Sequence, residues 1–351
     1  MVLFLALLSI FLGFICAAYQ QLPTYIMALG YGWSHNLELK RWLLRILALG
    51  SFALLLSYQP SLWAIIPTAM ILSFLLVFSL INANYDVFRA LEADQLLKLK
   101  ENYFQETAEV VGYLNENNKA ICYPVEEIIK PRHLLNDVFM NEKILISYCA
   151  ACHSSMVYSR LVANQELHFQ VIGVYRRNMI IRDIETGTIW QQGTGEAVYG
   201  KLKGNNLTML PYQQMKANDW LKLYPDSLIA RESSQAPKGL FPKKRLLQML
   251  KITEHLVAPG LSDLSGLPLR EKIWGVEING TAKAYPESEL KNVSTFNDQL
   301  GEIQIEIFYD SNSNFITGKE KISGQPLKFQ NHWWFGWKEF HPKTEIWKAK
   351  K

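Results

Sequence analysis

Charge is nearly missing from the first quarter of this sequence. Residues 1–84 contain only Glu38, Lys40, Arg41 and Arg45, which leaves 33 of the 36 basic and 31 of the 32 acidic side chains to the other 267 positions. A long stretch with so few charges is typical of membrane segments, and a balanced mixture of charges is typical of a domain in water. The sequence therefore predicts a membrane region followed by a soluble region.

The chain also lacks a strong excess of charge of either sign, since its formal net charge is only +4. A dedicated nucleic-acid-binding protein normally carries a clear basic excess, so we expect a membrane partner and no nucleic acid. Disorder is excluded as well, because 49% of the residues are apolar and 19% are charged.

Three apolar runs, at residues 2–18, 42–58 and 61–83, are candidate transmembrane helices. A spanning helix needs roughly 20 apolar residues, and the third run meets that length best. The first run could instead be a cleaved signal peptide, but no charged residue precedes it, so we expect a retained helix. Residues 85–107 mix apolar and charged positions at helical spacing, which predicts a juxtamembrane helix.

Three spans would place residues 19–41 and the soluble region on the same side of the membrane. That side carries Lys40, Arg41, Arg89, Lys98 and Lys100, whereas the other side carries only the N-terminal amine. The positive-inside rule therefore favours a cytoplasmic soluble region in a bacterial inner membrane.

The soluble region contains sequence motifs that occur twice. Tyr123-Pro124, Asn136-Asp137 and Tyr148 recur, almost in register, as Tyr285-Pro286, Asn297-Asp298 and Tyr309. Period-two alternation of apolar residues and turn signals such as Asn279-Gly280 predict mainly β structure with short helices. We expect an α-helical membrane anchor followed by a mainly β (α+β) region built as a degenerate tandem repeat. Its parts would be a first copy at 108–234, a linker at 235–265 and a shortened second copy at 266–348.

Cysteine is scarce, with four in the chain, and two of these form the motif Cys149-Ala150-Ala151-Cys152 after a predicted strand. Two thiols at this spacing can cycle between dithiol and disulfide, and a positive neighbour can activate one of them. The second copy has Asp310 and Ser313 in their place, so it cannot perform thiol chemistry.

Other interpretations of the pair stay open at this point. The motif extends to Cys149-x-x-Cys152-His153, which is the attachment pattern of c-type haem, but a β context is unusual for it. Zinc or another soft metal would need two more ligands, with Cys122, His133, His153 and His168 as candidates. The two cysteines could also be packed side chains without chemistry.

A polar cluster follows the cysteine motif and could support a reaction or bind substrate. Its members, with the histidine of the motif, are His153, Arg177, Asn178, Asp183, Trp190 and Glu196. Glu196 could move protons. Gly193-Thr194-Gly195 is a weak phosphate signal, because no helix follows it. The aromatic run at residues 332–337 predicts packing at a core or a domain interface.

These residues resemble the bacterial domain-of-unknown-function 3179 family. The similarity covers about residues 108–230 and rests on a set of short motifs: Lys119-Ala120, Tyr123-Pro124, Asn136-Asp137, Tyr148-Cys149-x-x-Cys152-x-Ser154, Asn178-Met179, Asp183, Thr186-Gly187, Trp190-x-Gln192, Gly195-Glu196-Ala197, Gly200, Leu202-Lys203-Gly204, Trp220 and Tyr224-Pro225-Asp226-Ser227. Some relatives are described as selenoproteins at the cysteine pair, which implies redox or peroxide chemistry at Cys149 and Cys152. The family usually has Gly, Asn or Arg after the second cysteine, which makes haem less fitting at His153. Relatives are often exported, which points to the side opposite to that favoured by charge.

The working hypothesis is a membrane-anchored thiol–disulfide redox protein in which Cys149 attacks and Cys152 resolves, with an unidentified redox or protein partner and no cofactor. The alternative is a module without turnover that binds a soft metal or acts as a scaffold, with haem as the weaker variant.

Overall fold

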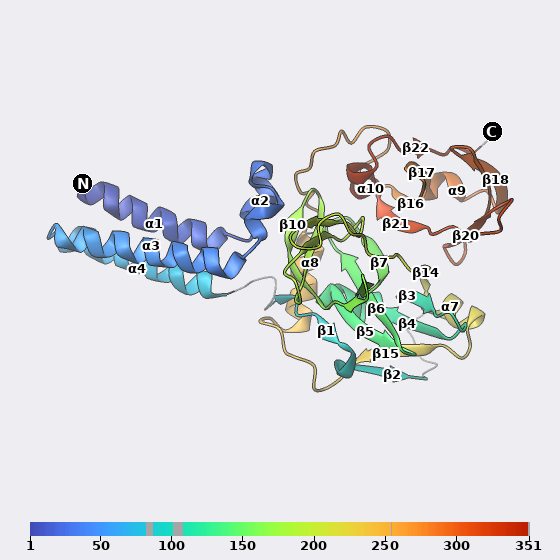
Figure 1. Ribbon diagram of the computed structural model, residues 1–351, viewed down its shortest axis with the longest axis horizontal. Helices are drawn as coiled ribbons and strands as arrows, with labels where there is room; N and C mark the ends of the chain where they lie inside the picture. The colour runs from blue at the N-terminus through green and yellow to red at the C-terminus, as the bar shows by residue number, and fades with distance from the viewer. Residues whose placement is uncertain (82–86, 101–107, 254, 350–351) are drawn as a thin grey trace.

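The computed structural model describes residues 1–81, 87–100, 108–253 and 255–349 (Figure 1). Three helices form a bundle at the N-terminal end, in which α1 packs against both α3 and α4. Their bounds are α1 Val2–Ala18, α3 Leu37–Ser57 and α4 Leu62–Leu80. The bundle projects from a mainly β region that contains the rest of the described chain, so the structure is of mixed α and β type.

One of the three candidate membrane helices meets the expected length and composition. α4 is long and apolar enough to cross a membrane, whereas α1 is apolar but shorter. α3 begins at Leu37 rather than at residue 42, so it contains all four charged residues of the N-terminal region. The prediction of three spanning helices is thus corrected to one clear candidate.

Two of these charged residues link α3 to the end of α4 within the bundle. Arg41 and Arg45 are buried, and their guanidinium groups donate hydrogen bonds to the backbone carbonyls of Ser79 and Ile81 at the end of α4. The last carbonyls of a helix have no partner within the helix, so cations stabilise this end.

The connection between α1 and α3 lies against the β region. It contains α2 Leu22–Tyr25 and the short helices η1 Met27–Leu29 and η2 Tyr31–Ser34. The Thr24 hydroxyl donates to the Val174 carbonyl at 2.8 Å, and the Tyr175 hydroxyl donates to the Met27 carbonyl at 2.8 Å. The end of the bundle is therefore attached to the sheet edge that carries Val174.

Three sheets form the first half of the β region. One has the order β1-β5-β6-β7, one has the order β14-β3-β4-β15-β2, and one has the order β10-β11-β12-β13. Their bounds are β1 Leu91–Glu92, β2 Leu96–Leu99, β3 Glu109–Leu114, β4 Ala120–Pro124, β5 Leu134–Phe139, β6 Glu142–Cys149, β7 Ser154–Ser159, β10 Phe169–Tyr175, β11 Asn178–Asp183, β12 Ile189–Gln191, β13 Ala197–Tyr199, β14 Tyr212–Lys216 and β15 Leu228–Glu232. Shorter elements here are η3 Ala93–Gln95, η4 Val125–Ile129, α6 Lys130–Arg132, α7 Ala217–Leu223 and the hairpin of β8 Leu161–Val162 with β9 Gln165–Glu166.

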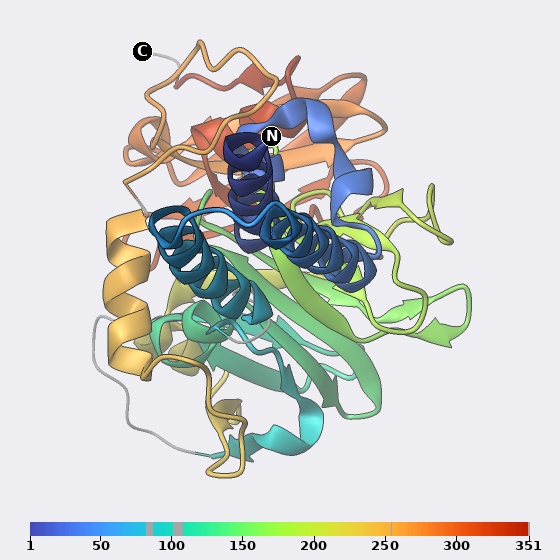
Figure 2. The same cartoon turned by 90° about the vertical axis from the view of Figure 1, so that its left-hand side faces the viewer.

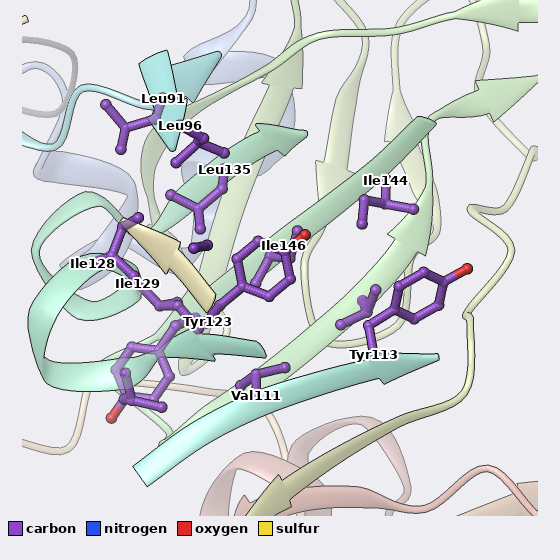
Figure 3. Packing of buried hydrophobic residues seen from close by; sticks show 14 of the residues in the cluster. Leu91, Leu96, Val111, Tyr113, Tyr123, Ile128, Ile129, Leu135, Ile144 and Ile146 are labelled. Atoms are coloured by element: carbon purple, nitrogen blue, oxygen red, sulfur yellow. The ribbon is translucent and has the colours of Figure 1, made fainter. Parts of the chain in front are cut away.

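The sheet that contains β6 is buried on both faces. Ile144 and Ile146 pack on one side in the core that Figure 3 shows, whereas Leu145 and Cys149 belong to a second core on the other side. Successive residues of a strand point to opposite faces, so the odd-numbered positions of β6 share one face. This alternation places the sulfur of Cys149 toward the sheet of β10 and β11.

The second half has two sheets, ordered β21-β16-β17-β22 and β18-β19-β20. Their bounds are β16 Lys272–Ile278, β17 Thr281–Pro286, β18 Thr295–Leu300, β19 Ile303–Asp310, β20 Phe315–Glu320, β21 Gln330–Trp333 and β22 Glu345–Ile346, with the helices α9 Glu287–Leu290 and α10 Trp334–Phe340. α8 Lys243–Thr253 lies in the predicted linker and joins the two halves.

The predicted juxtamembrane helix is wrong where the structure describes it. Over residues 91–99 the chain forms β1, η3 and β2 instead. β2 pairs antiparallel with β15, and β1 pairs in parallel with β5. Leu91 and Leu96 pack into the core of Figure 3, whereas Leu97 and Leu99 are exposed, so sheet pairing outweighs the helical spacing of the apolar positions. The remainder of the predicted helix, at 85–86 and 101–107, lies outside the described residues.

Candidate functional site

A tight connection brings the two cysteines together. Cys149 ends β6, Ser154 begins β7, and these two residues face each other across the hairpin. His153 has a backbone φ of 54°, in the left-handed region that Gly and Asn adopt most readily. This conformation explains why Gly and Asn are among the residues that the family resemblance implies at this position.

Both thiols are free and buried, and each sulfur accepts a hydrogen bond. Asn178 Nδ2 donates to Cys152 Sγ at 3.0 Å, and Ser154 Oγ lies 3.2 Å from the same sulfur. The backbone N–H of Met179 donates to Cys149 Sγ at 3.3 Å. Polar groups of β7 and β11 therefore surround the pair within an otherwise apolar core.

The two thiols differ in acidity. Burial raises the pKa of Cys149 well above its usual range, and its hydrogen bond to Cys152 adds to this effect. Burial acts in the same direction on Cys152, but its interactions with Cys149, His332 and Ser154 outweigh burial and hold the pKa of Cys152 well below its usual range. The surroundings therefore favour the thiolate form at Cys152 and disfavour it at Cys149.

The second half of the β region closes the site. The backbone N–H of Trp333 donates to the Cys152 carbonyl at 3.1 Å, and Phe335 belongs to the same apolar core as both cysteines. α10 approaches so closely that a Cβ on Gly336 would lie 2.5 Å from Cys152 Cβ. Sequence reasoning missed His332, although the prediction of an interface at residues 332–337 pointed to the right segment.

An amide network fixes the groups around Cys152. Asn178 Oδ1 accepts hydrogen bonds from Gln191 Nε2 at 2.7 Å and from the Gly193 N–H at 2.8 Å. Gln192 Oε1 accepts from Asn178 Nδ2 at 2.8 Å and from Ser154 Oγ at 3.2 Å. Because both ends of the Asn178 amide are hydrogen-bonded, its N–H already points at the sulfur, and no reorganisation of this donor is needed during the reaction.

Two other predicted site residues serve the fold. Asp183 and Trp190 are fully buried, and the indole Nε1 donates to Asp183 Oδ2 at 2.8 Å. The carboxylate also accepts from the backbone N–H of Thr186 at 2.6 Å, which fixes the turn after β11. Neither side chain has a polar contact with the thiols among the described residues.

Arg177 and Glu196 also lie apart from the sulfurs. Arg177 pairs with Glu339 of α10, together with Arg176 at 2.9 Å, so the turn between β10 and β11 is tied to the second half. Hydrogen bonds from Leu261 and Ser262 and the two guanidinium groups lower the pKa of Glu339 despite its burial. Glu196 is exposed, and its backbone N–H bonds Thr194 Oγ1.

His153 packs beside the pair rather than against the sulfurs. Its ring stacks on Trp333 at 5.1 Å, and its Nδ1 lies 2.9 Å from the Tyr148 hydroxyl. Burial lowers the pKa of His153 to about 3, so the ring is neutral. Trp333 therefore covers one face of the His153 ring. In the described part of the chain, no group of three or more His, Cys, Asp or Glu side chains could hold a metal ion.

Cys149 borders a cavity. It lines a cavity of about 550 Å³ together with His133, Met179 and residues of α2, β10 and α8. Cys152 is not among the residues that line this cavity. The two cysteines are therefore distinct, because one lines a cavity and the other contacts the amide network.

Comparison with known proteins gives a family but no characterised relative. The family model described as "Protein of unknown function (DUF3179)" matches residues 90–330. No curated protein and no solved structure matches the chain. The match ends just before His332, so that residue, α10 and Glu339 lie outside it.

Proposed function

We propose a function for a chain that belongs to the DUF3179 family of proteins of unknown function: it is a membrane-anchored thiol–disulfide redox protein that acts through Cys149 and Cys152. The observation that carries the proposal is the asymmetry of the pair. Cys149 lines a cavity, whereas Cys152 accepts a hydrogen bond from Asn178, contacts Ser154 Oγ and has a lowered pKa.

This asymmetry suits thiol–disulfide exchange. In the reducing direction, a partner thiolate attacks the sulfur of Cys149, the residue of the pair that lines the cavity, the bond between Cys149 and Cys152 breaks, and Cys152 leaves as a thiolate. A leaving thiol with a low pKa leaves faster, so the hydrogen bonds to Cys152 assist the step. A second partner thiolate then displaces Cys149, which takes up a proton, and the partner becomes a disulfide. Two electrons move to the pair in each cycle.

The reverse direction gives Cys149 the role of attacking thiol that the sequence suggested. Its proton must first leave, and burial raises its pKa, so this step is slower at neutral pH than attack by an exposed thiol. Cys152 then resolves the intermediate by attack on the sulfur of Cys149. The amide network and the interaction with His332 favour the thiolate of Cys152 in that attack.

The outer surface of the bundle supports a membrane anchor. Apolar side chains that are more than half exposed occur on all three helices: Phe4, Phe11, Leu47, Trp63 and Phe74. Water would disfavour such a surface, whereas the hydrocarbon of a bilayer matches it. Because the connection between α1 and α3 contacts β10, that connection and the β region share one side of a bacterial inner membrane.

The two halves support an origin as a tandem repeat. In the first half β3 pairs antiparallel with β4 and β14, and β4 pairs in parallel with β15. In the second half β16, β17, β21 and β22 repeat these pairings in order and direction. Trp220 bonds Ser227 at 2.8 Å just as Trp337 bonds Thr344 at 2.9 Å. We infer that a copy without thiols became the cover of the thiol site.

A redox titration with mass spectrometry tests the function. The full-length protein in detergent is equilibrated at defined potentials and alkylated, and the modification of each cysteine is counted. Cys149 and Cys152 should convert together as a two-electron couple between about −300 and −120 mV, the range of known thiol–disulfide proteins. Cys122→Ser is the matched control, because Cys122 is equally buried and lies in a different core.

Two outcomes would contradict the function. A pair that stays reduced at every potential has no redox role, and only a scaffold function then remains. A pair that stays oxidised at every potential is a structural disulfide. Thiol labelling in intact cells also shows which side of the membrane carries the β region.

A further inference from the structure

The cavity beside Cys149 has an unusual lining. Among the described residues that line it, there is no Asp, Glu, Lys or Arg, and most are apolar, including Phe88, Val171 and Leu250. The polar side chains are Gln20, Gln21, Thr24, Tyr25 and His133, besides Cys149 itself. Such a lining disfavours phosphates, carboxylates and charged peptides, which need cationic or anionic partners. It suits an uncharged and largely apolar small molecule.

The position of the cavity indicates where this molecule comes from. One wall is α2 and the residues just before it, which directly follow α1 of the bundle, and another wall is the end of α8 with the loop after it. Figures 1 and 2 place both on the side of the β region that faces the bundle. Two lining residues are strongly exposed and apolar in their bodies, Tyr25 at 70% and Leu256 at 63%. The cavity therefore has an apolar rim at the end of the proposed membrane anchor.

The polar groups of the cavity fit the transfer of a proton. His133 Nδ1 lies 2.7 Å from the Tyr148 carbonyl, which can only accept, so Nδ1 carries the proton and Nε2 carries a lone pair. Burial lowers the pKa of His133 to about 4, so the ring stays neutral at pH 7. One sulfur that can give up electrons and one neutral imidazole that can accept a hydrogen bond thus line the same space.

We propose that this cavity binds a lipophilic quinone from the membrane and that the quinone is the electron acceptor of the cysteine pair. The inference rests on the proposed redox function. A quinone is uncharged, dissolves in the bilayer and takes up two electrons and two protons, which equals what two thiols release when they form a disulfide. The volume of about 550 Å³ lies within the range for small-molecule sites and accommodates a substituted ring with part of an isoprenoid tail.

The reaction balances as follows. The Cys149 thiolate adds to a ring carbon of the quinone and forms a carbon–sulfur bond, while the electron pair moves to a quinone oxygen. The Cys152 thiolate attacks the sulfur of Cys149, the carbon–sulfur bond breaks, and the sulfur–sulfur bond forms. The Cys149 proton and one proton from water at the exposed rim of the cavity pass to the two oxygens, which gives a hydroquinone whose hydroxyl can donate to an imidazole nitrogen.

Binding is tested apart from turnover. The full-length Cys149→Ser/Cys152→Ser protein, reconstituted in phospholipid vesicles, cannot transfer electrons, and a short-chain benzoquinone is titrated against its tryptophan fluorescence. Ala258→Trp narrows the cavity from an irregular loop and should weaken binding at least about tenfold. Leu261→Trp is the matched control, because Leu261 lies in the same loop, is exposed and does not line the cavity. Equal binding by both variants overturns the proposal.

Turnover is tested with the native cysteines. The reduced protein should convert one quinone to hydroquinone per cysteine pair, and Ala258→Trp should slow this reaction while the redox titration of the thiols stays unchanged. Oxidation of the pair by a lipid hydroperoxide but not by the quinone overturns the assignment of the acceptor. If the thiols fail to titrate at all, the redox function fails, whereas the binding result on the double variant still stands on its own.

Discussion

Asn178→Ala tests the reasoning about the acidity of Cys152 most directly. The change removes the amide that donates to Cys152 Sγ at 3.0 Å, while Ser154 and His332 remain. A hydrogen bond to a charged group contributes about 1.5–3 kcal/mol. One pKa unit corresponds to about 1.4 kcal/mol, so the pKa of the Cys152 thiol should rise by about 1 to 2.

The same free energy affects the redox equilibrium. Asn178 stabilises the reduced form, because only the thiolate accepts a strong hydrogen bond. Its loss should make the pair harder to reduce, and the midpoint potential should fall by about 30 to 60 mV, since 30 mV corresponds to about 1.4 kcal/mol for two electrons.

The assay measures thiolate absorbance in the ultraviolet as a function of pH, with the Cys152→Ser protein subtracted. Gln191→Ala is the matched control, because Gln191 bonds Asn178 Oδ1 and the Met179 carbonyl but has no hydrogen bond to either sulfur. An unchanged pKa in Asn178→Ala, or an equal rise in Gln191→Ala, would refute the assignment of the effect to the N–H that faces the sulfur.

Three further predictions concern the surroundings of the site. Gly336→Ala and Gly112→Ala should each lower the free energy of unfolding by about 1–3 kcal/mol, because the added Cβ would lie within 2.5 Å of its neighbours. Only Gly336→Ala should also shift the midpoint potential of the thiols, because its Cβ would contact Cys152. His153 has a pKa of about 3 in the folded protein, so on acidification the unfolded chain binds a proton at this residue before the folded protein does. The free energy of unfolding, measured with urea, should therefore be highest above pH 6.5 and should fall as the pH is lowered. His153→Asn should reduce that slope by about 1.4 kcal/mol per pH unit, and an unchanged slope contradicts the assignment. Glu339→Gln should lower the free energy of unfolding by roughly 3 kcal/mol, because two arginines lose their buried carboxylate. The variant should also be cleaved faster by protease in the loop near residue 261. Equal proteolysis rates in the variant and the native protein would show that this ion pair does not hold the halves together.

Local pattern predicted the positions of single elements well. The run at residues 2–18 forms a helix with those bounds, and the strand predicted before the cysteine motif is present, although β6 extends through Cys149 itself. The prediction failed for residues 91–99, where apolar positions at helical spacing belong to strands. Their pairing partners, β5 and β15, lie far along the chain, and spacing within one segment cannot reveal them.

The candidate site shows the same division. The residue types around the thiols were visible in the sequence, and Asn178, which was predicted in the supporting cluster, donates to Cys152 Sγ. Arg177, Asp183 and Trp190 were grouped with it because they are polar or aromatic neighbours along the chain, yet their partners are Glu339 and each other. A strand directs neighbours to opposite faces, so closeness in sequence does not mean closeness to the sulfurs.

By itself the sequence determined the division into an apolar helical part and a mainly β part, and it determined that only the first half carries thiols. These properties follow from composition and short-range periodicity, which act within each segment. Only the tertiary structure decided that His332 from the second half lies beside Cys152, and that α2 and α8 enclose a cavity at Cys149. Such contacts join segments more than a hundred residues apart, and they arise from packing between faces that no local pattern specifies.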